Sequence, residues 1–306
     1  MTFDYKRIIK NRRTRQRLLR QLDWIPDRVM VPLQYRMKTG RWPNLKNPQR
    51  FTEKLQWLKL NYRDSLMRQC ADKVAVRSYV ASCGLENILV PLLGVYNSPQ
   101  EIDFDMLPDQ FVLKDSLGGG GNEVLICADK DSFDWNNASV RMQEWVVPGR
   151  HQKHPGREWV YDTPGSSKIL AEVYVAPDFA NDGLVEFKFL CFYGKPSYLY
   201  VLGNRMLGHS AKLGIFKADD MSRVEAWSSA ESRLTDEPLR PGCYGEMMDA
   251  AARLSEPFPE ARIDFYYAGE QSGFRFSEIT FFDASGYFLF EPDSFDYELG
   301  NSFILP

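Results

Sequence analysis

The stretch Asp109-Gln-Phe-Val-Leu-Lys114 is followed at once by Asp115-Ser-Leu-Gly-Gly-Gly-Gly-Asn122. The apolar centre of the first part predicts a short β-strand, and a second strand over about residues 123–127 would close a hairpin-like unit. The four glycines, Gly118, Gly119, Gly120 and Gly121, predict a flexible turn between these strands. Glycine N–H groups can donate to oxyanions and Lys114 adds a positive charge, so this unit is suited to hold phosphate.

The spacing around this loop excludes two common nucleotide-binding motifs. The sequence is neither the G-x-x-x-x-G-K-[ST] of a Walker A loop nor the G-x-G-x-x-G of a dinucleotide fingerprint. A run of four glycines on its own is also more often a flexible turn than a ligand-binding loop. The loop therefore needs support from other residues before it indicates a function.

Outward from this unit, helices and strands follow one another without a repeating order. Residues 31–60 mix proline, aromatic and basic residues, which predicts an irregular lead-in to a helix near 53–60. Apolar spacing over 65–83 fits one helical face, and residues 148–165 have the composition of a loop. Helices are also expected over residues 132–146 and 244–255, and strands over 168–175, 185–193, 197–202, 262–267 and 274–281. This mixture predicts an α+β fold.

Composition excludes several classes of protein. The 306 residues are 44% hydrophobic and 26% charged, which is typical of a globular chain long enough for roughly two lobes of about 150 residues. A net charge of -3 argues against a nucleic-acid partner bound through bulk positive charge. Five cysteines without C-x-x-C spacing predict buried thiols and neither a disulfide framework nor a zinc site. With no apolar stretch of membrane-spanning length and no export signal, we expect a cytoplasmic protein.

The N-terminus is strongly basic. Residues 1–20 contain eight Lys and Arg against Asp4 alone, interleaved with isoleucine and leucine, which predicts a partly amphipathic helix. Such a helix either makes peripheral contact with anionic lipid at the inner face of the membrane or packs as a solvated helix on the main body. The sequence leaves both alternatives open.

Acidic residues on the expected strands form a second group of candidates. Asp264 and Glu278 lie on strands separated by one turn, so antiparallel pairing can bring their carboxylates together as hard oxygen ligands for Mg²⁺. Glu186 and Lys188 share one face of an earlier strand, because side chains alternate, and Glu172 lies on the strand before it. Unrelated surface carboxylates and a structural ion pair are the alternatives. For the loop histidines His151 and His154, which lack a nearby carboxylate or cysteine in sequence, we expect a surface loop and not a metal site.

Taken in order, these signals resemble the ATP-grasp fold in its TupA-like branch, which is known from teichuronopeptide and other polysaccharide biosynthesis. Three long phrases carry the likeness: Phe51-Thr-Glu-Lys-Leu-Gln-Trp-Leu-Lys59, Ala71-Asp-Lys-Val-Ala-Val-Arg77 and Glu186-Phe-Lys-Phe-Leu-Cys-Phe-Tyr-Gly-Lys195. The resemblance covers about residues 48–292 and implies two α+β lobes that clasp ATP.

The resemblance also implies a role for each candidate. Lys73 and Lys114 correspond to lysines that contact the ATP phosphates, and Gly118 to Gly121 correspond to a mobile loop over them. Glu172 begins the hinge that binds adenine, and Glu186 holds the ribose hydroxyls. Lys188 and Arg262 are the catalytic cations near the transferred phosphate. The implied Mg²⁺ ligands are Asp264, Glu278 and Thr280.

Two departures from the family pattern bear on these roles. Most ATP-grasp enzymes have asparagine where this chain has Thr280, a poorer ligand, and the glycine loop lacks the Asn-His pair that the branch carries after its lysine. The implied reaction phosphorylates a carboxylate with ATP and then joins it to an amine, with an amino acid added to a surface polysaccharide or its precursor. Arg205 and His209 are the candidates for contacting the substrate.

The expected organisation is a basic helical extension over residues 1–47, a segment with the small lobe and glycine loop over 48–170, and a large lobe with the metal site over 171–306. A glycosyltransferase of the same pathway is one alternative function. Asp103-Phe-Asp105 has the D-x-D form that such enzymes use, although its context predicts a surface turn. A nucleotide-binding scaffold without turnover is the other alternative.

Overall fold

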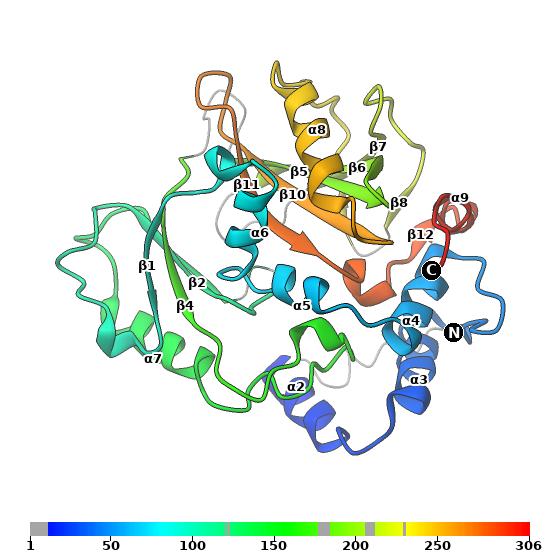
Figure 1. Ribbon diagram of the computed structural model, residues 1–306, viewed down its shortest axis with the longest axis horizontal. Coiled ribbons are helices and arrows are strands. Elements are labelled where there is room, and N and C mark those ends of the chain that lie inside the picture. Colours follow the sequence, from blue (N-terminus) through cyan, green and yellow to red (C-terminus); the bar gives the residue numbers. More distant parts are fainter. Residues whose placement is uncertain (1–11, 120, 122, 177–183, 206–211, 229–230) are drawn as a thin grey trace.

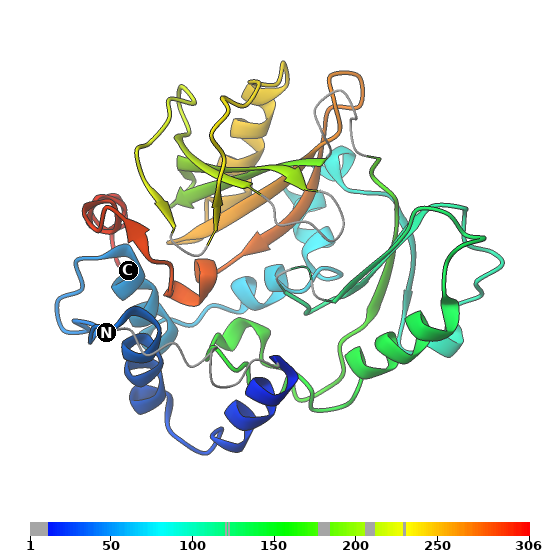
Figure 2. The same cartoon turned by 180° about the vertical axis from the view of Figure 1, so that it is seen from behind.

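The computed structural model describes residues 12–119, 121, 123–176, 184–205, 212–228 and 231–306. It contains two main sheets, antiparallel except for one short parallel pair at the edge of the larger sheet, and this confirms the expected α+β class. Figure 1 shows the smaller sheet and the larger sheet on either side of a group of short helices, and the view from behind in Figure 2 shows the same arrangement.

The first third of the chain is helical. Its helices are α2 (Arg12–Gln21), α3 (Asp27–Thr39), α4 (Phe51–Asn61), α5 (Ser65–Ala71), α6 (Val76–Ser82) and the 3-10 turn η1 (Glu86–Ile88). An N-terminal helix and the helix near 53–60 were expected from the sequence. The irregular lead-in was wrong for residues 31–39, because α3 continues through Pro32 to a left-handed Gly40. The single helical face over 65–83 was also wrong, since Asp72 Oδ1 accepts hydrogen bonds from the N–H groups of Val74 and Ala75 and separates α5 from α6.

The small sheet has the strand order β1-β4-β2-β3. Its strands are β1 (Leu92–Tyr96), β2 (Phe111–Asp115), β3 (Val124–Cys127) and β4 (Ile169–Val173). The expected hairpin is present, because β2 and β3 pair antiparallel from Phe111–Cys127 to Lys114–Val124. Between β1 and β4 lie η2 (Pro99–Glu101), α7 (Trp135–Trp145) and η3 (Trp159–Tyr161). Figure 1 shows α7 beside this sheet.

The large sheet has the strand order β11-β10-β5-β6-β7-β9. Its strands are β5 (Leu184–Phe192), β6 (Lys195–Arg205), β7 (Lys212–Lys217), β9 (Ser232–Arg233), β10 (Ala261–Tyr267) and β11 (Phe274–Thr280). Helix α8 (Tyr244–Ser255) covers one of its faces, as Figure 1 shows. The chain ends with η5 (Asp283–Gly286), β12 (Phe290–Glu291) and α9 (Ser294–Ser302). β12 pairs with the short strand β8 (Trp227–Ser228), which lies between β7 and β9 in sequence.

Two hydrophobic cores match the two sheets. One core lies under the small sheet and α7, around Phe111, Leu113 and Trp145. The other joins the large sheet and α8 to helices α4, α5 and α6. Helices α4, α5 and α6 therefore share the core of the large sheet, while the division into three regions remains a prediction. All five cysteines are free thiols. Cys70, Cys127 and Cys191 are buried, as expected, whereas Cys83 and Cys243 are partly exposed. No helix in the described part of the chain is long and apolar enough to cross a membrane.

Candidate functional site

A cavity of about 700 Å³ is lined by residues of both sheets, the glycine loop and the segments around η3 and η5. The candidates from the sequence that line it are Lys73, Lys114, Gly118, Gly119, Gly121, Glu186, Lys188, Arg262, Glu278 and Thr280. Glu172 and Asp264 lie directly behind this lining and are buried. Gly120 and His209 lie outside the described residues, and for Arg205 the structure describes only the backbone, at the end of β6.

Strand pairing brings the charged candidates of the large sheet into one row. Asp264 on β10 lies opposite Lys188 on β5 and opposite Glu278 on β11. Residues directly opposite on neighbouring strands point to the same face, so the three side chains can interact. Arg262 lies opposite Thr280 in the same way. The alternation of side chains along each strand, read from the sequence, therefore places these groups together.

Asp264 is fully buried and binds two cations. Its Oδ2 is 2.5 Å from Lys188 Nζ, and its two oxygens accept hydrogen bonds of 2.8 Å from Nε and Nη2 of Arg262. Lys188 Nζ is also 2.8 Å from Glu186 Oε2, and Arg262 Nη1 forms an ion pair with Asp283. Opposite charges in direct contact stabilise groups that would otherwise be costly to bury. The result is a continuous line of alternating charges across the cavity floor.

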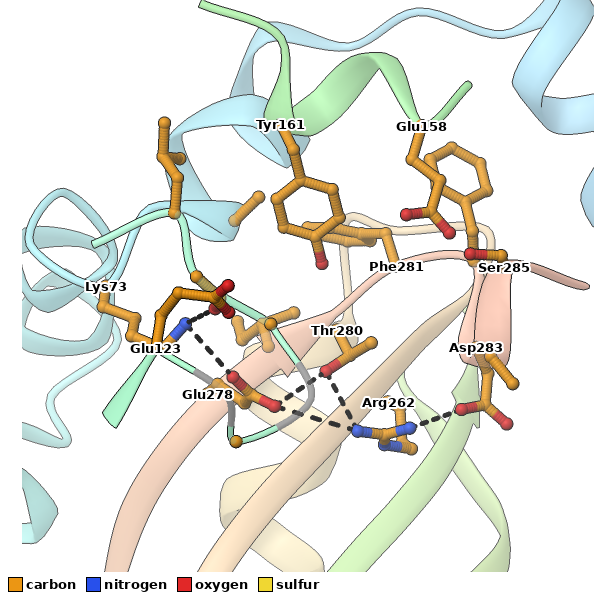
Figure 3. A pocket seen from close by; sticks show the side chains of 18 of the residues that line it. Lys73, Glu123, Glu158, Tyr161, Arg262, Glu278, Thr280, Phe281, Asp283 and Ser285 are labelled. Atoms are coloured by element: carbon orange, nitrogen blue, oxygen red, sulfur yellow. Dashed lines mark hydrogen bonds and ion pairs between the residues drawn. The ribbon is translucent and has the colours of Figure 1, made fainter. Parts of the chain in front are cut away.

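Glu278 is the carboxylate of this row that remains partly open to the cavity, with 29% of its side chain exposed. Burial alone would raise its pKa, but Lys73, Lys188 and Arg262 together lower the pKa of Glu278 to about 2. Lys73 Nζ lies 3.4 Å from Glu278 Oε2, and the Thr280 hydroxyl lies 3.4 Å from Oε1, as Figure 3 shows. Glu278 is therefore ionised at neutral pH and faces the cavity beside a hydroxyl oxygen.

Lys114 reaches the cavity from the small sheet. Its Nζ is 2.6 Å from Glu172 Oε2, and the other oxygen of Glu172 is 3.0 Å from Arg77 Nη1. The neighbouring Tyr266 hydroxyl and Glu172 carboxylate raise the pKa of Lys114 above its ordinary value, although burial opposes this. Lys114 is thus a fixed cation, and Glu172 is enclosed by two cations.

The glycine loop is held at its start by the turn that carries Lys73. The Nζ of Lys73 donates to the Gly118 carbonyl over 2.5 Å, and its backbone N–H donates to the Ser116 carbonyl over 2.9 Å. A Cβ on Gly118 would come within 2.6 Å of Glu123 Cβ, whereas a Cβ on Gly119 would meet nothing within 4 Å. Close approach therefore requires glycine at position 118, and position 119 tolerates a side chain.

One wall of the cavity comes from residues 148–166. His151 and His154 lie in a loop, as expected, but this loop lines the cavity. His154 Nδ1 lies 3.0 Å from the buried carboxylate of Glu158, and His151 Nε2 lies 3.3 Å from Asp115 Oδ2. Figure 3 shows Glu158 and Tyr161 on the side of the cavity opposite Arg262 and Glu278. Glu158 lies only four residues after His154, so the expectation that these histidines lack a nearby carboxylate was wrong. Asp115, the partner of His151, lies 36 residues away in sequence.

Hydrogen bonds from side chains of α4 join residues 148–166 to the segment that follows β11. Lys59, whose side chain is buried, donates through Nζ to the carbonyls of Gly156 and Ser285 over 2.9 and 2.8 Å. Gln56 Nε2 also donates to the Ser285 carbonyl, over 3.1 Å. Ser285 and its neighbour Ala284 have positive φ angles of 57° and 47°, which are unfavourable for residues with a side chain. The hydrogen bonds from α4 therefore fix a strained segment that lines the cavity.

The donor set fits a divalent cation only in part. The Glu278 carboxylate and the Thr280 hydroxyl are hard oxygen donors that face the cavity. Both oxygens of Asp264 bind Lys188 or Arg262, so Asp264 would have to release a cation before it could ligate a metal. Among the described residues, no group of three or more His, Cys, Asp or Glu side chains is arranged to hold a metal ion.

A family model described as TupA-like ATPgrasp matches residues 53–304. No curated protein matches the chain. Among solved structures, the chain is similar to D-alanine–D-alanine ligase from Bacillus anthracis, with 18% identity and a TM-score of 0.40 over 69% of this chain and 57% of that one. The same enzyme complexed with ATP gives 15% identity and a TM-score of 0.41, over 69% of this chain and 55% of that one.

A third similar structure is N5-carboxyaminoimidazole ribonucleotide synthetase in complex with ADP. Its identity to this chain is 11% and its TM-score is 0.43, over 74% of this chain and 49% of that one. The chain therefore spans only about half of the length of these solved structures.

Proposed function

Because the chain belongs to the TupA-like ATP-grasp family, we propose that it is an ATP-dependent ligase that joins a carboxylate to an amine. The observation that carries this proposal is the row Lys188–Asp264–Glu278, which lies beside Lys73 at one cavity. ATP and a carboxylate substrate both bring negative charge to the reaction. Several fixed cations around one cavity are suited to hold both.

The cations would hold the phosphates of ATP. Lys73 and Lys114 line the cavity together with the glycine loop, and Lys188 lines its floor. Arg262 is oriented by Asp264 and Asp283 before any substrate arrives, so little rotamer freedom is lost when it binds an oxyanion. The N–H groups of residues 118–121 would close over the phosphates, and Glu186 would bind the ribose.

For Glu172, the contacts support a role behind the nucleotide. Its carboxylate is enclosed by Lys114 and Arg77. We therefore propose that Glu172 positions Lys114, and that the backbone after Glu172 contacts the adenine.

Glu278 and Thr280 would hold Mg²⁺, with Asp264 as a further ligand once it is released from a cation. The metal, when bound, neutralises phosphate charge and polarises the bond to the transferred phosphoryl group. Glu278 stays ionised because of its cationic neighbours. The Arg262 guanidinium stabilises negative charge on the phosphoryl oxygens.

The chemistry proceeds in two transfers. An oxygen of the substrate carboxylate attacks the γ-phosphorus of ATP, and ADP leaves, which gives an acyl phosphate. The nitrogen of the amine then attacks the acyl carbon, phosphate leaves, and the amine loses a proton to form the amide. Lys188 and Arg262 balance the charge in the first transfer. Closure of the glycine loop excludes water that would hydrolyse the acyl phosphate.

The wall of residues 148–166 is suited to the second transfer. His154 lines the cavity, and the buried Glu158 carboxylate beside its Nδ1 orients the ring. A histidine held by a carboxylate is a common general base. We propose that His154 accepts the proton of the attacking amine, and Arg205 and His209 remain predictions for substrate contact.

The branch that the sequence resembles points to polysaccharide biosynthesis. We propose that the carboxylate or the amine belongs to a surface polysaccharide or its lipid-linked precursor, and that the other substrate is an amino acid. The proposed site of reaction is the cytoplasm, where ATP is available. The D-x-D segment of the glycosyltransferase alternative lies in a turn, with the Asp105 N–H bonded to Asp103 Oδ1, and it does not line the cavity.

The test is ADP release from Mg-ATP in the presence of pooled amino acids and uronic acids. The proposal expects release that needs a carboxylate substrate, together with an amide detected by mass spectrometry. UDP-sugar turnover without ADP release would support the glycosyltransferase alternative. ATP binding without release across both pools would support the non-catalytic scaffold.

A further inference from the structure

The N-terminal helices carry a concentrated apolar surface. Of the sixteen large hydrophobic side chains that are exposed in the described part of the chain, seven lie between residues 18 and 42. They are Leu18, Leu22, Trp24, Val29, Leu33, Met37 and Trp42, and we call them the N-terminal face. Trp24 and Trp42 are 79% and 63% exposed. Exposed apolar side chains scattered singly are normal, but a concentration of them in one segment is a mark of a site of interaction.

The orientation of α3 is fixed, so this face does not turn inward. Val29, Leu33 and Met37 follow one another at intervals of four residues and form one stripe along the helix. The opposite side of α3 is buried, and there the Tyr35 hydroxyl lies 3.0 Å from Thr52 Oγ1. Figure 1 shows α2 and α3 at the edge of the molecule, beyond α4 and α5. The apolar stripe of α3 is therefore exposed on the outside of the molecule.

Charge identifies what that surface fits. Residues 1–46 contain 13 Lys and Arg against three Asp, whereas residues 47–306 contain 25 Lys and Arg against 38 Asp and Glu. Arg28 and Arg36 are exposed beside the apolar stripe of α3. A second copy of this chain would bring two basic faces together, which is unfavourable. An apolar stripe with flanking arginines and tryptophans at both ends fits an anionic bilayer surface.

We propose that the N-terminal face binds the surface of an anionic membrane, with the stripe of α3 and the two tryptophans in the interfacial layer. The helices would lie on the bilayer and not cross it. This surface extends beyond the basic residues 1–20, because its apolar part is supplied by α3 and the segments on either side of it. The proposal does not depend on the reaction that the cavity performs.

The same helices are bound to the wall of the cavity. Arg20 of α2 lines the cavity and donates through Nη2 to the Arg150 carbonyl over 2.9 Å. The side chain of Arg157 is buried and donates to the carbonyls of Leu22 and Ile25 over 2.8 and 3.2 Å. Membrane contact would thus hold the cavity close to a lipid-linked acceptor, a consequence that rests on the proposed function.

The test is co-sedimentation of the full chain with vesicles of phosphatidylcholine that contain about one third phosphatidylglycerol, with pure phosphatidylcholine for comparison. The variant Leu33→Glu/Met37→Glu places two charges in the stripe. The control Met106→Glu/Val140→Glu makes the same change of charge at apolar positions elsewhere that are 81% and 64% exposed. Circular dichroism and thermal unfolding establish that both variants are folded.

We expect the wild type to bind the anionic vesicles, with binding that weakens as salt rises, and the stripe variant to bind about tenfold more weakly or worse. The control variant should stay within about threefold of the wild type. Addition of vesicles should shift tryptophan fluorescence to the blue, and Trp24→Phe/Trp42→Phe should lose most of that shift.

Three results would overturn the proposal. The first is no binding of the wild type to anionic vesicles at low salt. The second is an equal loss of vesicle binding in the stripe variant and the control variant, because the change in net charge would then explain the whole loss. The third is a wild-type dimer in sedimentation that only the stripe variant dissociates, which would assign the face to a second copy. Since no ATP is present, none of these results bears on the ligase proposal.

Discussion

The Nζ of Lys114 and the Oε2 of Glu172 lie 2.6 Å apart, at a point where two neighbouring strands of the small sheet meet the cavity. Both side chains are almost fully buried, and Arg77 approaches the other oxygen of Glu172. One carboxylate therefore compensates the buried Lys114 and the partly buried Arg77. This pairing holds the Lys114 ammonium in place at the edge of the cavity.

Glu172→Gln should destabilise the protein by about 3 kcal/mol, because it leaves Lys114 and Arg77 without their shared counter-charge. Denaturant unfolding measures this, with Glu86→Gln at an exposed position as the control. A loss no larger than that of the control would contradict the role assigned to Glu172.

Replacing each of the two glycines at the start of the loop by alanine should change the affinity for ATP by different amounts. Gly118→Ala should raise the Kd for ATP about tenfold, since the new Cβ would collide with Glu123 and displace the loop. Gly119→Ala has open space around it and should change the Kd by less than about threefold. Calorimetric titration with Mg-ATP separates the two variants, and equal effects would remove the steric account of this loop.

Glu260 should make stability depend on pH. It is fully buried next to β10, and burial together with Asp283 raises the pKa of Glu260 from 4.5 to about 8. Since the folded pKa lies above the unfolded one, its favourable contribution is complete below about pH 4.5 and is lost as the pH rises towards 8.

Glu260→Gln mimics the neutral carboxyl, so relative to the wild type it should gain up to about 1.4 kcal/mol per pH unit across that window. Unfolding free energies at pH 5 and pH 8 measure this gain. Glu256→Gln, at an exposed position four residues earlier, is the control. The contradicting result is a stability difference between Glu260→Gln and the wild type that does not change from pH 5 to pH 8. It would show that Glu260 is ionised in the folded protein.

His154→Gln should separate the two transfers of the proposed reaction. Without a general base, the acyl phosphate would be lost to water, so the amide formed per ADP should fall at least about tenfold. ADP release itself should change by less than about threefold, because the phosphate contacts remain. An equal fall in both products would place His154 in ATP binding or folding.

The sequence predicted the parts of the site that depend on local pattern. Antiparallel pairing of two strands separated by one turn was the basis for bringing Asp264 and Glu278 together, and the two residues lie opposite each other in the structure. The hairpin around the glycine loop followed from its apolar strands in the same way.

The parts that depend on distant contacts were not predictable from pattern. His154 becomes part of the cavity wall because Lys59 bonds to both Gly156 and Ser285. These two residues lie 97 and 226 positions after Lys59 in the sequence. Helix α3 was missed because Pro32 and its aromatic and basic neighbours suggest a break. Burial of Tyr35 against α4 stabilises that helix through tertiary contact.

The most direct test of the ligase account is amide-coupled ADP release by the wild type, Glu278→Gln and the exposed control Glu246→Gln, followed over a range of Mg²⁺ concentrations. Glu278 is ionised, faces the cavity and is the best-placed carboxylate for Mg²⁺, so its neutral variant should lose activity at least about a hundredfold while the control keeps it. The ligase account would be contradicted by a Glu278→Gln variant that forms amide and ADP at the wild-type rate with unchanged dependence on Mg²⁺.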